Sequence, residues 1–142
     1  GLDNILTRFA RCCNPVPGDE IQGVVTMGRG ISVHRKDCIN IRGDKIAPER
    51  IVDASWLEDP DTLYPVEIEI SASDRPRLLS DIVSAISEKK INITAVEGRT
   101  DRNFISTINL VMMVKDHDHL QQIKNNIRKV EDVISVRRHT SI

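Results

Sequence analysis

The chain has 142 residues, a length that fits one domain or two small ones. With 39% hydrophobic and 29% charged residues it can bury a core, and no apolar run approaches the roughly 20 residues that a bilayer requires. We therefore expect neither a disordered chain nor a membrane protein. Three cysteines, an odd number, argue against a disulfide framework and indicate a reducing, cytoplasmic location.

The net charge of −1 is unevenly distributed along the chain. Residues 1–50 carry a balance of +2, residues 51–73 hold six acidic residues and no basic one, and the remainder carries +3. Two mildly basic parts are thus separated by an acidic segment, which permits local nucleic-acid contacts without requiring them. We place a domain boundary in this segment, with a first domain over 1–57, a linker over 58–63 and a second domain over 64–142.

The first domain is predicted to be a small α/β unit. Hydrophobic periodicity and turn residues predict its elements in order: a helix over 2–13, strands over 21–26 and 31–33, a helical turn over 34–41 and a third strand over 51–56. The first two strands are joined by a hairpin with Arg29 between two glycines at its tip. So small a unit has little core, a situation in which a structural ion commonly helps.

The second domain shows a firmer pattern. Its predicted elements are a strand over 64–71, a helix that Asp74 caps and whose apolar face runs from Leu78 to Ile86, strands over 91–96 and 104–114, a helix over 120–130 and a strand over 133–138. The order βαββαβ is that of the ferredoxin-like fold, so the whole chain is expected to be α+β. With aromatics at 3% of the chain, base stacking on this sheet is not expected.

Every cysteine of the chain, with one histidine, falls between Arg8 and Cys38. Cys12, Cys13, His34 and Cys38 supply the Cys₃His set of a structural zinc site. Adjacent cysteines can both reach one ion only at a helix end or an irregular turn, and Asn14-Pro15 offers such a place. The alternative is that these cysteines are small buried residues and His34 caps a turn.

A redox or thiol enzyme is a further alternative. A reactive thiolate needs a neighbouring base or a helix N-terminus, whereas Cys12 and Cys13 lie at the predicted C-terminal end of a helix, where the dipole opposes negative charge. The sequence contains neither a glycine-rich phosphate loop nor a paired-carboxylate site, so catalysis has little support.

Two separated motifs resemble one known family. RFARCCNPVPGDEI with GRGISVHRKDC resembles the zinc-finger-like segment in the C-terminal regulatory half of the Rel/SpoT family, the bacterial stringent-response synthetases and hydrolases of (p)ppGpp. YPVEIEISASDRPRLLSDI with KINITAVEGRTD resembles the ACT domain that ends those enzymes. The resemblance implies a regulatory fragment without catalytic activity of its own, because the hydrolase and synthetase domains are absent from this sequence.

In that family this region docks on the ribosome when uncharged transfer RNA occupies the A site, and relays that state to the synthetase half. The resemblance implies that the first domain contacts large-subunit ribosomal RNA and that Cys12, Cys13, His34 and Cys38 are the metal ligands. Phosphate contacts are expected from the basic side chains of the same domain, namely Arg8, Arg11, Arg29, Arg35 and Lys36. Taken singly, each of these is equally well a solvated surface residue.

Family ACT domains bind a branched-chain amino acid near the start of the first helix, often at a dimer interface. The matching positions are Asp74, Arg77, Leu78 and Asn92. The family usually has glycine where this chain has Arg77, and a long cationic side chain there either fills the pocket or pairs with a ligand carboxylate. An amino-acid-sensing or dimerising ACT module without an RNA role is therefore the alternative function.

Overall fold

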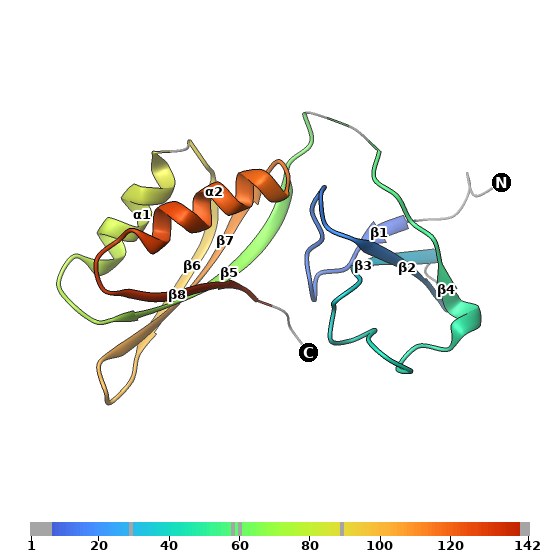
Figure 1. Cartoon of the computed structure of the whole chain (residues 1–142), viewed down its shortest axis with the longest axis horizontal. Helices are drawn as coiled ribbons and strands as arrows, with labels where there is room; N and C mark the ends of the chain where they lie inside the picture. Colours follow the sequence, from blue (N-terminus) through green and yellow to red (C-terminus); the bar gives the residue numbers. More distant parts are fainter. Residues whose placement is uncertain (1–6, 29, 58, 60, 89, 140–142) are drawn as a thin grey trace.

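The structure is a computed structural model that describes residues 7–28, 30–57, 59, 61–88 and 90–139. Figure 1 shows two sheets, one built by the N-terminal part of the chain and one, with both labelled α-helices, by the remainder. The elements of the described residues are β1 Thr7–Phe9, β2 Ile21–Thr26, β3 Gly30–Arg35, the 3₁₀ turn η1 Pro48–Arg50, β4 Ile51–Val52, β5 Tyr64–Ser73, α1 Leu78–Ser87, β6 Ile93–Thr100, β7 Ile105–Val114, α2 His117–Arg128 and β8 Val133–Arg138. The expected α+β architecture is confirmed.

The first sheet has the strand order β1-β3-β2-β4. β1 runs parallel to β3, while β2 is antiparallel to β3 and to β4. β2 has the predicted bounds, and β3 is longer than predicted at both ends. Gly28 and Gly30 have φ of +71° and +82°, the left-handed backbone that a tight hairpin between these strands requires.

The predicted N-terminal helix is wrong for the part that the structure describes. Thr7–Phe9 is a strand whose residues lie beside Ile31–Val33, because pairing with β3 satisfies its backbone better than one isolated helical turn would. The remaining apolar positions of that prediction, residues 2, 5 and 6, lie outside the described residues.

Two further predictions for this part are also wrong. The helical turn over 34–41 is replaced by the end of β3 and two successive turns, in which the Cys38 amide donates to the Arg35 carbonyl and the Ile41 amide to the Cys38 carbonyl. The third strand is only Ile51–Val52. Beyond it the chain leaves the sheet and carries Trp56 into contact with both parts of the molecule.

The second sheet has the order β6-β7-β5-β8, with every pairing antiparallel. This is the ferredoxin-like arrangement predicted from the order of elements. Both α1 and α2 cover the same face of the sheet (Figure 1), and the alternate residues of β5 and β7 that point to this face are buried. None of the helices in the described part of the chain combines the length and apolarity needed to cross a membrane.

The start of the first long helix differs from the prediction. Asp74 does not cap it, and the helix begins only at Leu78, after Arg77 in the left-handed region with φ of +68°. Asp74 is tied instead to the end of the β6–β7 hairpin, since its amide donates to the carbonyl of Phe104 at 2.8 Å. The segment between β5 and α1 is therefore an ordered loop at the edge of the sheet.

Residues 14–19, here called the docking loop, lie between β1 and β2 in the chain and pack against the second sheet and α2. Val16 is fully buried and belongs to the apolar core of the second sheet. The Pro17 carbonyl accepts a hydrogen bond of 2.8 Å from the amide of His117 at the start of α2. Gly18 has φ of +101°, and a Cβ there would lie 2.7 Å from the Cβ of His117, so this close approach requires glycine.

A buried ion pair completes this junction. One terminal nitrogen of Arg138, at the end of β8, lies 2.9 and 3.0 Å from the two carboxylate oxygens of Asp19, and the other donates to the Asn14 carbonyl at 2.7 Å. The two charged side chains are only 12% and 8% exposed. Each buried charge compensates the other, so separating the two would leave a buried charge without its partner. The pair therefore fixes how the docking loop meets the second sheet.

Three aromatic side chains form a cluster beside the docking loop. Phe9 of β1 stacks on Trp56 with ring centroids 5.2 Å apart, and Tyr64 of β5 meets both rings edge-on at 5.6 and 5.5 Å. The Trp56 indole also donates to the Asp19 carbonyl at 3.1 Å. These contacts hold the first strand of each sheet against the segment that connects the sheets.

Candidate metal centre and ligand pocket

The four metal-capable side chains singled out by the sequence come together. One donor atom each from Cys12, Cys13, His34 and Cys38, here called the Cys₃His cluster, lies within 4.8 Å of every other. Cys13 and Cys38 are buried, with 1% and 0% exposure, while Cys12 and His34 are partly accessible. Two turns distant in sequence thus meet at one end of the first sheet.

The adjacent cysteines reach the same point because they lie on a single helical turn. The Asn14 amide donates to the Ala10 carbonyl at 3.0 Å, which closes one turn around Cys12 and Cys13. Asn14 then has φ of +48°, and Pro15 prevents the helix from continuing. On this isolated turn neighbouring side chains need not diverge as they would in a strand, so both sulfurs face β3.

The other half of the cluster comes from the end of β3. Strand alternation places His34 on the face opposite Val33 and Arg35, toward the cysteine turn. The tight turn closed by Arg35 and Cys38 then reverses the chain and returns the Cys38 sulfur beside His34.

Three of the donor–donor distances within the cluster are close to those between ligands of one tetrahedral ion. The Cys12 sulfur lies 3.6 Å from that of Cys38 and 3.5 Å from His34 Nδ1, and the Cys13 sulfur lies 3.9 Å from the same nitrogen. Tetrahedral coordination with metal–sulfur bonds of about 2.3 Å and metal–nitrogen bonds of about 2.0 Å requires S···S near ~3.8 Å and S···N near ~3.6 Å. The donor set and its spacing therefore fit a soft divalent cation.

Outer contacts orient the ligands. Ser32 Oγ lies 3.0 Å from His34 Nε2, so with Nδ1 on the sulfur side the Nε2–H donates to the hydroxyl. The Arg35 backbone amide donates to the Cys13 sulfur at 3.4 Å. Such contacts fix the imidazole orientation and spread thiolate charge, as at metal sites generally.

Burial shapes the protonation of the cluster. It raises the pKa of the Cys13 thiol to about 12 and also raises the pKa of the Cys38 thiol, while it lowers the pKa of His34. Neutral thiols and neutral imidazole are thus favoured without a cation, and thiolates become favourable only when a cation compensates them. The raised pKa values oppose the reading of Cys13 and Cys38 as reactive thiols.

The basic residues proposed for RNA contacts do not share one environment. Arg8, Arg11 and Lys36 are exposed, whereas Arg35 is only 9% exposed. Arg8 lies beside Ser32 in the parallel β1–β3 pair, so it shares the face of His34, and Arg35 belongs to the opposite face. Arg29 lies outside the described residues.

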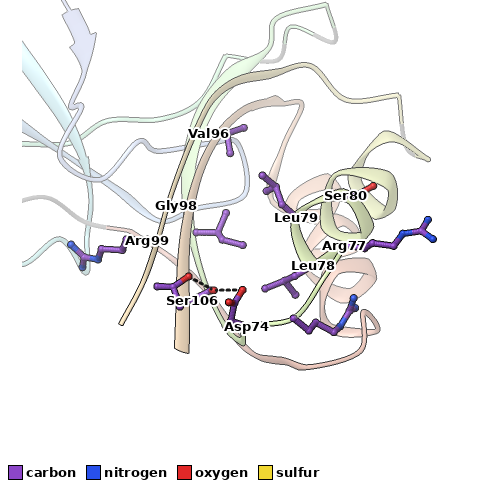
Figure 2. Close-up of a pocket in the computed structure, with 12 residues that line it drawn as sticks. Asp74, Arg77, Leu78, Leu79, Ser80, Val96, Gly98, Arg99 and Ser106 are labelled. Atoms are coloured by element: carbon purple, nitrogen blue, oxygen red, sulfur yellow. Dashed lines mark hydrogen bonds between the residues drawn. The ribbon is translucent and has the colours of Figure 1, made fainter. Parts of the chain in front are cut away.

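A cavity of about 570 Å³ lies between α1 and β6, on the helix-covered side of the second sheet (Figure 1). Figure 2 shows Asp74, Leu78 and Ser106 at its lower end, with Val96 and Gly98 of β6 facing Leu79 across it. The Ser106 hydroxyl donates to Asp74 Oδ1 at 3.2 Å and lies 2.9 Å from the Thr100 hydroxyl. The cavity thus combines an apolar wall with a polar end.

The sequence-predicted ligand residues fall partly in this cavity. Asp74, Arg77 and Leu78 line it, but the Arg77 side chain points away from the space (Figure 2) and so does not fill it. Asn92 is not among the lining residues, and its carbonyl accepts the Met113 amide before β6 begins. The structure does not bring Asn92 together with the other three.

Several contributing residues were missed by sequence reasoning. Ser32 and Ser106 gave no signal, because a single serine in a strand is common and its partner is known only after folding. Gly98 did offer a signal, since a glycine inside a strand often marks a place where something approaches closely.

Comparison with known proteins identifies the class. The family profile of the RelA/SpoT RIS domain matches residues 1–57, and that of the ACT domain matches residues 60–138. The chain belongs to the RelA/SpoT family and corresponds to its C-terminal region.

Individual relatives agree with this assignment. The chain is 39% identical over 141 residues to a GTP pyrophosphokinase of Streptomyces coelicolor, 40% identical over 141 residues to the bifunctional (p)ppGpp synthase/hydrolase RelA of Mycobacterium tuberculosis, and 40% identical over 140 residues to the Escherichia coli GTP pyrophosphokinase. These alignments cover 97–99% of this chain but only 17–19% of each relative. Among solved structures, the ACT domain of a Chlorobium tepidum GTP pyrophosphokinase is 30% identical, with a TM-score of 0.49, and the match covers 54% of this chain and 99% of that one.

The Ser32 contact predicts a mutational effect. Ser32→Ala removes the group that orients His34, and we expect divalent zinc or cobalt to bind about 10- to 100-fold more weakly. Competition with a chromophoric chelator measures this affinity. Ser135→Ala, a change at an exposed serine of β8, is the matched control. Equal affinity in all three proteins would show that Ser32 does not support the site.

Proposed function

We propose that the chain is a non-catalytic regulatory segment that docks on the ribosome through large-subunit ribosomal RNA and relays amino-acid starvation to catalytic domains elsewhere in a longer, cytoplasmic protein. The activity that its relatives' names state belongs to proteins of which this chain spans less than a fifth. We further propose that residues 1–57 and 64–142 act as two domains joined by a linker over 58–63. The Cys₃His cluster is the main support for this proposal, because a metal ion there would fix the fold of residues 1–57 and so the positions of their basic side chains.

We propose zinc as the ion of the Cys₃His cluster. Three thiolates and one imidazole are the ligands of structural zinc sites, which are closed and four-coordinate. The donor spacing supports this choice, and the cysteine turn, the end of β3 and the turn after it already present all four donors. Zinc there would stabilise the first domain by cross-linking the cysteine turn to the end of β3.

The proposed RNA contact rests on exposed cations near the cluster. Arg8 lies in β1 just before the cysteine turn, Arg11 directly precedes Cys12 within that turn, and Lys36 lies between the two ligands His34 and Cys38. Guanidinium and ammonium groups bind phosphate oxygens without reading base sequence, which suits a helix of ribosomal RNA recognised by shape. The proposal also includes A-site transfer RNA as a partner reached through the full-length protein.

Loss of one of these cations has a defined expected effect. Arg11→Ala and Arg29→Ala each weaken binding to ribosomes and lower the slope of log affinity against log salt by about 1. Filter binding or sedimentation at several salt concentrations measures both quantities. Arg102→Ala, at an exposed arginine in the β6–β7 turn, is the control. If affinity and slope match the unmodified chain in both variants, the RNA proposal for these residues fails.

The cavity beside α1 supports a second candidate function, the sensing of a branched-chain amino acid. Its apolar wall suits an aliphatic side chain, and its polar end at Asp74 and Ser106 suits an ammonium group. The outward direction of Arg77 leaves the space open (Figure 2). An ACT-mediated homodimer is compatible with the same candidate.

Calorimetry tests the amino-acid candidate. We expect valine or isoleucine to bind, and Asp74→Asn to weaken that binding about tenfold through loss of the charge-assisted hydrogen bond. Asp101→Asn, in the neighbouring hairpin, controls for a general loss of negative charge. Absence of heat with both amino acids removes this candidate and leaves the ribosomal proposal intact.

A further inference from the structure

A cavity of about 500 Å³ lies where the end of β3 and the docking loop meet α2 and β8. It is distinct from the Cys₃His cluster and from the cavity beside α1. Four cationic side chains line it, two from each part of the chain, namely Arg35, Lys36, Lys124 and Arg138. Neither half of the molecule supplies this set alone.

The fold explains how the cations reach one place. Alternation along β3 sends Arg35 to the face opposite the ligand His34, toward the second sheet. On α2, His117, Gln121 and Lys124 are separated by four and three positions, so they share one helix face, and all three line the cavity. Arg138 enters from the end of β8 and anchors the docking loop.

Lys124 is the informative side chain. It is partly buried, and within the described residues no carboxylate pairs with it. Burial lowers the pKa of its ammonium group, and the neighbouring charges of Arg128, Arg138 and Arg35 lower it further. A partly buried ammonium group with three arginines as neighbours lies in a positive local potential.

Three acidic residues, Asp19, Glu20 and Asp37, also line the cavity, and Asp19 and Asp37 lie beside its two arginines. Both carboxylate oxygens of Asp19 accept hydrogen bonds from Arg138, and Oδ2 also accepts one from the Val16 amide. Asp37 lies 3.8 Å from Arg35 Nε, but its side chain is 74% exposed and so points largely into water. Glu20 is exposed, and within the described residues none of the three carboxylates forms an ion pair with Lys124. The cations of the cavity thus outnumber its carboxylates, and Lys124 is a cation that no carboxylate pairs with among the described residues.

We propose that this cavity binds a phosphate group, with Lys124 as the central cation and Arg35 and Lys36 completing the site. The positive charges of arginine and lysine compensate the negative charge of phosphate, and their N–H groups donate hydrogen bonds to its oxygens. Because the cations come from both parts of the chain, a bound phosphate stabilises the docked arrangement of the two sheets relative to a separated one. The phosphate belongs either to a free nucleotide or to an RNA backbone.

This inference goes beyond the ribosomal and amino-acid proposals, and its test requires neither ribosomes nor an amino acid. Inorganic phosphate is titrated into the full metal-loaded chain at low salt, and backbone amide shifts are followed by NMR. We expect saturable shifts at Lys36, Gln121 and Lys124. Lys124→Gln should weaken the apparent affinity at least about fivefold, Lys124→Arg should retain it, and Lys129→Gln, at an exposed lysine beyond the end of α2, should leave it unchanged.

Control measurements distinguish a loss of phosphate binding from a loss of folding. Far-UV circular dichroism and thermal unfolding establish that each variant is folded, and the arginine variant guards against a purely structural loss. Titrations with GDP and with a short RNA duplex then identify the source of the phosphate, because the ligand that shifts the same amides at lower concentration than inorganic phosphate is the natural one. Equal phosphate binding by the chain and by Lys124→Gln, or shifts spread evenly over surface lysines, would overturn the proposal.

Discussion

The first sheet depends on one constraint. The donor atoms of Cys12, Cys13, His34 and Cys38 must meet at one point. Among the residues that the structure describes, its apolar contacts form two small groups, one of Ala10, Cys13 and Cys38 and one around Ile21, Ile31 and Val33. The second sheet, by contrast, buries residues from β5, β7 and both α-helices in one continuous core. A unit with so little apolar burial gains most from a cross-link between distant turns, and the Cys₃His cluster provides the donors for one.

The cluster is also continuous with the junction between the sheets. Cys13 is followed directly by the docking loop, whose Asn14 carbonyl and Asp19 carboxylate both bind Arg138. On the other side, His34 and Arg35 are neighbours in β3 with opposite directions, one toward the cluster and one toward the cavity against α2. The shape of the cysteine turn and the position of the second sheet are therefore linked by a few consecutive residues.

Much of the fold followed from sequence periodicity. β2, β7 and β8 were placed almost to the residue because their apolar alternation is regular, and the βαββαβ order gave the second sheet. The failures have a common cause. Thr7–Phe9 and His34–Arg35 carry helix-compatible spacing, but pairing within the first sheet outweighs local preference in such short segments. The start of α1 was misplaced because Asp74 has the chemistry of a helix cap yet bonds across to the hairpin.

For the candidate site, residue type identified the four donors, but only the folded chain shows that they meet. The orienting Ser32, the engaged Asp19 and the partly buried Lys124 each depend on contacts between segments far apart in sequence. Such contacts leave no local pattern. For Arg35 the local pattern was misleading. Its sequence neighbours suggested an exposed RNA-binding residue, but alternation along β3 places it in the cavity between the sheets.

If the proposed metal centre is correct, Cys12, Cys13, His34 and Cys38 jointly hold one zinc ion. X-ray absorption spectroscopy at the zinc edge, on the chain purified without chelator, tests it most directly. We expect one ion per chain, with three sulfur neighbours at about 2.3 Å and one nitrogen at about 2.0 Å. A first shell of oxygen and nitrogen only, or a folded chain that retains no zinc, would contradict it.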